Sequence, residues 1–284
     1  MTIIQTLIIA IVEGLTEFLP VSSTGHMIIA QSLLGIESTP FVKAFTIIIQ
    51  FGAILSVVCL YWKRFFRLDH TPAPVGSTTT QKILHTWDFY WKLFVAFIPA
   101  VVFGFIAKVS GLIDKFLENV TIVAVMLVVG GIFMLFCDRL FNKGLENNKI
   151  TNKRAFNIGL WQCLSLIPGT SRSMTTIVGG MAQKLTRRSA AEFSFFLAVP
   201  TMAAATGLDF IDLFKGDISW ATADNMSMLA LGSVVAFVVA LLAMKWFVSF
   251  LNKYGFCAFG VYRIIVGGFI LAWLLTGHSL VMVG

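Results

Sequence analysis

The chain has 284 residues, of which 57% are hydrophobic and 12% are charged, and its net charge is +7. Charged residues make up about a quarter of a soluble domain, so this composition excludes a soluble globular protein and predicts an all-α integral membrane protein. No RNA- or DNA-binding motif accompanies the positive charge. We therefore expect membrane lipids, and no nucleic acid, as partners.

The first half of the chain opens with a broken apolar segment. Residues 3–19 are mostly apolar, Pro20 interrupts them, and a second short apolar piece covers residues 27–34. Each piece is too short to cross a bilayer once the polar residues between them are left out, so we predict a re-entrant helical hairpin. Three candidate transmembrane spans follow, at residues 41–62, 88–107 and 120–137, with a solvent loop over residues 63–87.

The second half repeats this order after a charged loop over residues 138–154. Two short apolar pieces, residues 155–167 and 173–185, flank a Pro-Gly-Thr-Ser break and predict a second hairpin. Three further candidate spans cover residues 190–210, 228–251 and 256–276. The sequence thus predicts six transmembrane helices and two re-entrant hairpins.

The two halves are weakly similar in sequence. A shift of 148 residues places Pro20 on Pro168 and Ser23 on Ser171 without a gap. We therefore predict a single membrane domain over residues 1–284, with repeat 1 at about 1–137 and repeat 2 at about 155–284.

The charges indicate how the repeats are oriented. A hairpin that returns to its own side, followed by three spans, inverts the second repeat relative to the first. Fifteen of the 21 lysines and arginines then fall on one side and four on the other, with Arg172 and Arg263 set aside as lying within the membrane. By the positive-inside rule, both termini and the first hairpin face the outside or periplasm.

The polar residues of the first break form the motif EGLTEFLPVSSTGH, residues 13–26. Glu13 and Glu17 are four residues apart and share one face of a helix. Two carboxylates this close in a low dielectric repel, so either one holds a proton or a cation lies between them. A divalent ion held by two carboxylates and a substrate phosphate is the usual magnesium arrangement. The alternative is a helix end whose glutamates point into interfacial water.

The residues after Glu17 are suited to anion binding. Pro20 is expected to end the first helix, and Ser22, Ser23 and Thr24 are N-cap candidates for the next, whose free N–H groups would bind an anion. His26 lies three residues after Ser23 and could act as general acid or base for a serine nucleophile or a water. Alternatively, His26 is a hydrogen-bonded structural residue.

The second break contributes an arginine. Gly169 permits close approach of the backbone, Ser171 and Ser173 can cap the following helix, and Arg172 offers a planar donor fork suited to phosphate. Arg172 could instead pair with Glu13 or Glu17, and the two interpretations are compatible. We predict that the two breaks form one site.

These motifs and the layout closely resemble the undecaprenyl-diphosphate phosphatase (bacitracin-resistance protein) family of bacterial inner membranes. The resemblance rests on EGLTEFLPVSSTGH and PGTSRSMTT and extends from the first hairpin to the last span. It implies removal of the terminal phosphate from the carrier lipid undecaprenyl diphosphate, for cell-wall synthesis, with a divalent metal, Mg²⁺ or Ca²⁺, as cofactor. The chain departs from the family pattern at Met174-Thr175, where Gly-Ala is expected.

The resemblance also implies roles for individual residues. Its acidic pair falls on Glu13 and Glu17, as catalytic residues and metal ligands, and its first hydroxyl pair and histidine fall on Ser22, Ser23 and His26. The second motif places the phosphate-binding residues at Ser171, Arg172, Ser173 and Thr176, and Arg172 is also expected to be catalytic.

A transporter or lipid flippase is the alternative function. Inverted repeats with broken helices are typical of transporters, whereas the serine, histidine and carboxylate residues favour a phosphatase. The sequence leaves open whether Ser23 or an activated water attacks phosphorus, and whether the chain forms a homodimer.

Overall fold

The computed structural model describes residues 1–66, 78–111, 119–141, 143–146, 148–215 and 218–277. The centre of the predicted solvent loop, residues 67–77, and the last seven residues of predicted repeat 2 lie outside the described residues.

All the regular elements among the described residues are helices. The first half contains α1 (Ile3–Thr16), α2 (Ser23–Leu33), α3 (Pro40–Leu60), α4 (Trp62–Phe65), α5 (Thr79–Thr86), α6 (Asp88–Val109) and α8 (Val120–Phe141). The second half contains α9 (Asn152–Gln162), the 3₁₀ helix η1 (Cys163–Leu166), α10 (Arg172–Ala182), α11 (Arg187–Lys215), α12 (Ala223–Tyr254) and α13 (Cys257–Leu275). The predicted all-α class is confirmed.

Six of these helices are long and apolar enough to cross a membrane: α3, α6, α8, α11, α12 and α13. They coincide with the six predicted spans, and the chain is a multi-pass membrane protein. The prediction of a plain loop over residues 63–87 is wrong at both its ends, because α4 and α5 are helical there.

Threonines set the start of four helices. Thr2, Thr39, Thr151 and Thr222 each stand at an N-cap, and each side chain accepts a hydrogen bond from the backbone N–H three residues on. This bond satisfies a donor that the helix itself leaves unpaired. Two of these helices, α1 and α9, are the first arms of the two broken segments.

Glycines allow the helices to approach closely. A Cβ atom at Gly14 of α1 would lie 2.8 Å from the Ala236 carbonyl oxygen of α12, and one at Gly131 of α8 would lie 2.7 Å from the Gly260 oxygen of α13. Such contacts are typical of membrane helices, where packing rather than the hydrophobic effect drives association. A substitution at these glycines would push the helices apart.

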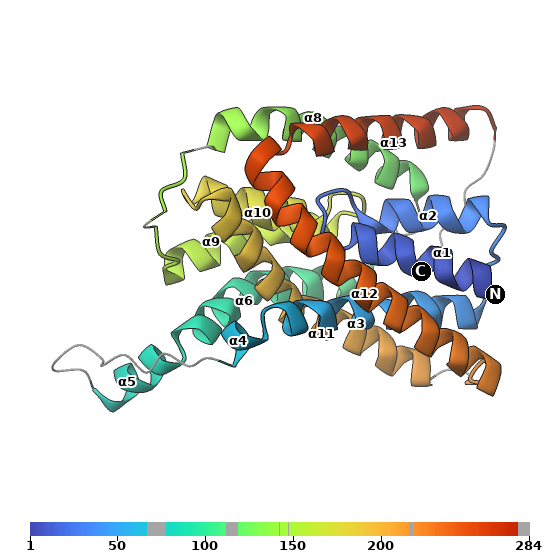
Figure 1. Ribbon diagram of the computed structural model, residues 1–284, viewed down its shortest axis with the longest axis horizontal. Coiled ribbons are helices and arrows are strands. Elements are labelled where there is room, and N and C mark those ends of the chain that lie inside the picture. The colour runs from blue at the N-terminus through green and yellow to red at the C-terminus, as the bar shows by residue number, and fades with distance from the viewer. Residues whose placement is uncertain (67–77, 112–118, 142, 147, 216–217, 278–284) are drawn as a thin grey trace.

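The short helices occupy opposite ends of the molecule. In Figure 1, α1 and α2 lie at the right and α9 and α10 at the left, and the break within each pair points toward the centre. Helices α8 and α13 run side by side along the top, and α12 runs from there across the front of the molecule to the lower right. This arrangement brings residues about 150 positions apart in sequence into contact.

Candidate active site

The first break begins earlier than predicted. Helix α1 ends at Thr16, and Glu17 is its C-cap, so the helix stops before Pro20. The residue before a proline is pushed out of the helical region, and here the turn includes the preceding residues as well. Ser22 then occupies the N-cap of α2 with φ 71° and ψ 99°, and its side chain makes no capping hydrogen bond.

The second break has the same backbone conformation at its end. Ser171 is the N-cap of α10 with φ 74° and ψ 113°, and its Oγ accepts from the Met174 N–H at 3.4 Å. A positive φ is strained for serine, and such strain persists where the surrounding structure demands it. The backbone thus matches Ser171 with Ser22, one residue away from the Ser23 match that the 148-residue shift predicts.

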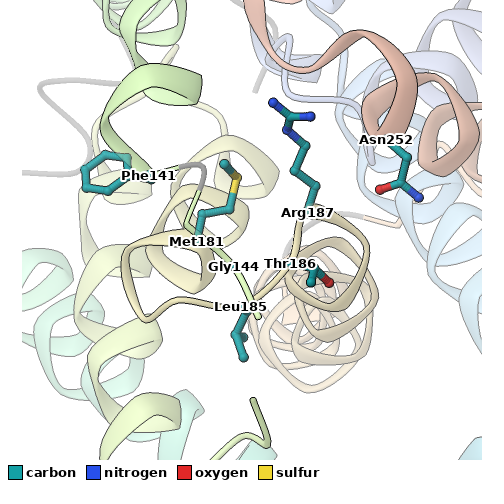
Figure 2. Close-up of a pocket in the computed structure, with 7 residues that line it drawn as sticks. All are labelled: Phe141, Gly144, Met181, Leu185, Thr186, Arg187 and Asn252. Atoms are coloured by element: carbon teal, nitrogen blue, oxygen red, sulfur yellow. The ribbon is translucent and has the colours of Figure 1, made fainter. Parts of the chain in front are cut away.

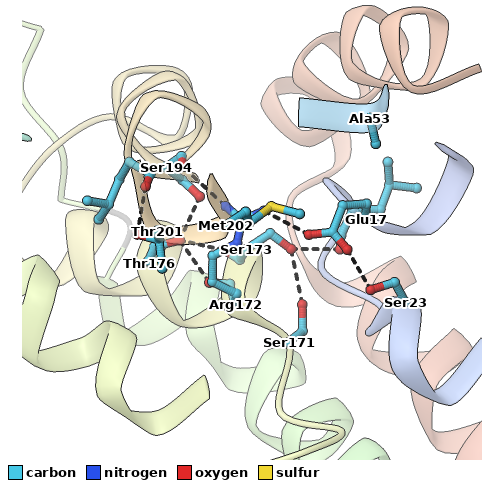
Figure 3. A network of polar contacts seen from close by, with 12 residues as sticks. Glu17, Ser23, Ala53, Ser171, Arg172, Ser173, Thr176, Ser194, Thr201 and Met202 are labelled. Atoms are coloured by element: carbon cyan, nitrogen blue, oxygen red, sulfur yellow. Dashed lines mark hydrogen bonds and ion pairs between the residues drawn. The ribbon is translucent and has the colours of Figure 1, made fainter. Parts of the chain in front are cut away.

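Glu17 joins the two breaks. Its Oε1 accepts from Nη2 of Arg172 at 3.1 Å, and its Oε2 accepts from Oγ of Ser23 at 2.6 Å (Figure 3). The Glu17 and Arg172 side chains are 9% and 12% exposed, so this is a nearly buried ion pair. One carboxylate therefore holds both a serine hydroxyl and a guanidinium.

Helix α11 holds the other side of Arg172. Its Nη1 donates to the Ser194 carbonyl at 3.3 Å, and Nη2 lies 3.4 Å from the Met202 sulfur. The guanidinium carbon lies 5.8 Å from the ring centroid of Phe18, in the first break, which adds a cation–π contact. These contacts fix the plane of the donor fork toward Glu17.

The other polar residues of the second break divide into two groups. Ser173 Oγ donates to the Leu19 carbonyl at 2.7 Å and lies 3.0 Å from Ser171 Oγ, at the contact between the breaks. Thr176 points elsewhere, since its Oγ1 lies 2.6 Å from Ser194 Oγ on α11. Ser171 and Ser173 therefore accompany Arg172, whereas Thr176 fastens α10 to α11.

Glu13 is buried without a partner. It is 0% exposed, and neither carboxylate oxygen has a hydrogen-bond partner among the described residues. Burying an unpaired charge is costly, so this carboxyl group needs either a proton or a cation. Among the described residues, no group of three or more His, Cys, Asp and Glu side chains could hold a metal. If Glu13 and Glu17 hold a divalent ion, water and phosphate oxygens must therefore supply the rest of its ligands.

His26 is directed away from Ser23. Its Nδ1 lies 2.8 Å from the Ser22 carbonyl oxygen, and its Nε2 lies 2.7 Å from the Tyr262 hydroxyl of α13. The predicted pairing of His26 with Ser23 is not formed, because Glu17 takes the serine hydroxyl. Thr24, in the first turn of α2, is half-buried and has no hydrogen bond to another described side chain.

Arg263, which was left out of the charge count as lying within the membrane, donates hydrogen bonds to both breaks. It is 0% exposed and donates to the Pro20 carbonyl at 3.2 Å, the Gly169 carbonyl at 2.8 Å and the Thr170 carbonyl at 3.0 Å. It also donates to two carbonyls of α8, those of Met126 and Leu127. An arginine inside an apolar helix is itself a signal of a buried polar partner.

A separate cavity of about 190 Å³ lies beside the turn between α10 and α11 (Figure 2). None of the motif residues lines it, and its Arg187 is paired with Asp138 at 2.6 Å. The lining residues are Phe141, Gly144, Met181, Leu185, Thr186, Arg187 and Asn252. This cavity is distinct from the contact between the breaks.

Comparison with known proteins identifies the family. Residues 6–269 match the family model described as bacitracin resistance protein BacA. The chain belongs to this family. Among BacA-family relatives, undecaprenyl-diphosphatase of Porphyromonas gingivalis is 54% identical, over 99% of each chain. The corresponding proteins of Flavobacterium psychrophilum and Bdellovibrio bacteriovorus are 53% and 46% identical, each over 100% of both chains.

We expect Arg263→Lys to destabilise this BacA-family protein. An ammonium has three donors and no planar fork, so it cannot serve five carbonyls, and each buried acceptor left without a donor costs about 1–3 kcal/mol. Thermal unfolding in detergent micelles should show that the free energy of unfolding falls by at least about 2 kcal/mol. The exposed Arg139→Lys is the matched control. Equal unfolding temperatures for the two variants would show that Arg263 does not hold the breaks.

Proposed function

We propose that this chain removes the terminal phosphate from undecaprenyl diphosphate and so regenerates the carrier lipid undecaprenyl phosphate. Family membership and relatives named undecaprenyl-diphosphatase over the full chain support the activity. The observation that carries the mechanism is the Glu17 carboxylate, which holds the Ser23 hydroxyl and the Arg172 guanidinium together. A nucleophile, a base and a phosphate-binding group thus meet at one point.

Ser23 is the proposed nucleophile. As its Oγ attacks the terminal phosphorus, Glu17 accepts the hydroxyl proton, and the bond from phosphorus to the bridging oxygen breaks, releasing the lipid monophosphate. Water then attacks the phosphoserine, the serine oxygen leaves and recovers its proton from Glu17, and inorganic phosphate is released. The short Ser23–Glu17 hydrogen bond favours this route over a Ser23–His26 pair.

Arg172 is the proposed phosphate clamp. Its charge is balanced by Glu17, and a phosphate that enters the site would offer oxygens to the same donor fork. Ser171, beside Arg172, can donate to a further oxygen, as can Ser173, if it releases the Leu19 carbonyl, and the free N–H groups at the start of α2 near Ser22 and Thr24.

Glu13 and Glu17 are the proposed ligands of a divalent cation, Mg²⁺ or Ca²⁺. Such an ion, when bound, would neutralise charge on the diphosphate oxygens. The fully buried carboxyl group of Glu13, which has no hydrogen-bond partner among the described residues, supports this assignment, since it needs either a cation or a proton.

We further propose that α1 with α2 and α9 with α10 are re-entrant hairpins of an inverted repeat in the bacterial inner membrane. When the halves are exchanged, the packing of α1 on α12 corresponds to that of α9 on α6, and the contacts of α8 with α13 and α3 with α11 map onto themselves. The matching backbone at Ser22 and Ser171 also supports the repeat. The charge asymmetry favours both termini outside the cytoplasm.

The activity can be tested with purified protein in detergent. We expect release of phosphate from undecaprenyl diphosphate, its loss on addition of a chelator, and its recovery with Mg²⁺ or Ca²⁺. Glu13→Gln should lower kcat/KM at least about 10-fold, whereas the exposed Glu37→Gln should not. A transporter would need a sealed compartment, so absence of phosphate release in detergent would contradict the phosphatase and favour the alternative.

The orientation can be tested by cysteine labelling in a variant that lacks the four native cysteines. Ser38→Cys, in the α2–α3 connection, should react with a membrane-impermeant maleimide in intact cells, whereas Glu146→Cys should react only in inside-out vesicles; both residues are exposed. Reaction of both residues from one face would rule out the inverted repeat.

A further inference from the structure

Tyr262 on α13 contacts His26 in two ways. Its hydroxyl lies 2.7 Å from Nε2 of His26, and the two rings are stacked, with centroids 5.5 Å apart and planes 9° from parallel. His26 also contacts the Ser22 carbonyl through Nδ1 at 2.8 Å. Both ring nitrogens of the imidazole are therefore engaged.

These partners determine the tautomer of a neutral His26. A carbonyl oxygen only accepts hydrogen bonds, so Nδ1 must carry the hydrogen that bonds to Ser22. Nε2 then has a free lone pair, and the Tyr262 hydroxyl donates to it. This is the less common tautomer of a free histidine, and in it the Nε2 lone pair is held by the Tyr262 hydroxyl.

The element that carries Tyr262 is fixed to the same break. The next residue, Arg263, donates to the Pro20 carbonyl, two residues before Ser22. Helix α13 therefore holds the backbone of the break through Arg263 and the imidazole through Tyr262. Stacking also restricts rotation of the His26 ring about its side-chain bonds.

We propose that Tyr262 is a positioning residue, whose hydroxyl donates to Nε2 and holds the imidazole of His26 beside the diphosphate site, in the Nδ1–H tautomer that the Ser22 carbonyl imposes. Tyr262 acts through His26 and does not itself touch the reacting atoms. The catalytic consequence rests on the proposed function, whereas the tautomer does not.

The tautomer can be measured by NMR on protein labelled with ¹⁵N only in its histidines. The chain has four histidines, and the signal lost in His26→Gln identifies His26. We expect the Nδ1–H form in the wild type and in Tyr262→Phe, and a shift of the Nε2 signal in Tyr262→Phe, which keeps the ring and removes the hydroxyl that bonds to Nε2. Tyr254→Phe, on α12, is the matched control and should leave the signal unchanged. An Nε2–H form in the wild type, or an unchanged Nε2 signal in Tyr262→Phe, would overturn the proposal.

A kinetic cycle tests the consequence for catalysis. Tyr262→Phe should lower kcat about 3- to 10-fold, the effect of one hydrogen bond, with KM changed less than about twofold. In the His26→Gln background, Tyr262→Phe should lower kcat no further, because Tyr262 acts through His26. If the loss of kcat in the double variant equalled the product of the two single losses, the role of Tyr262 would be merely structural, and the proposal would be overturned. If the wild type released no phosphate, the proposed function would fail, and the NMR result would still decide the role of Tyr262.

Discussion

Two broken helices meet inside an otherwise apolar protein, and their breaks leave backbone carbonyls that need donors. Arg263 supplies these donors, since its guanidinium binds carbonyls from both breaks and from α8. Its charge is balanced by carbonyl dipoles rather than by a carboxylate. The arrangement allows irregular backbone to be buried, which is possible only where its polar groups are satisfied by protein or water. Every other feature of the site depends on the breaks being held in this way.

The contact between the two breaks also brings Glu17 and Arg172 together as a buried ion pair. A buried ion pair contributes little net stability, because desolvation offsets much of the attraction between the charges. We propose that the role of the pair is exchange, since an arginine paired with a carboxylate can bind a phosphate in its place without first being left unpaired. The carboxylate that it leaves is positioned on the hydroxyl of Ser23. The contacts of Glu17 with Ser23 and Arg172 are therefore the ones that the proposed phosphoryl transfer needs.

Local patterns were sufficient to predict the helical class, the six spans and the two breaks, because proline, glycine and clustered polar residues stand out against long apolar runs. They also indicated that Arg172 could pair with Glu13 or Glu17, since an arginine in an apolar segment requires a polar or anionic partner. Arg263 donates to backbone carbonyls 93 and 243 residues away in the sequence, and no local pattern predicts partners at such separations. The partners of His26 and Ser23 were equally hidden, because they depend on how α1 and α13 pack. The shift by one residue at Ser22 shows that backbone geometry, rather than residue identity, aligns the two breaks.

The central claim is that both breaks act on one phosphate, and a double-mutant cycle on kcat/KM tests it most directly. Glu17→Gln, Arg172→Lys and the double variant would be compared in detergent with undecaprenyl diphosphate as substrate. If Glu17 and Arg172 work on the same transferring group, the loss in the double variant is at least about 10-fold smaller than the product of the single losses. A loss equal to that product would show that the two residues act independently, and the single shared site would be contradicted.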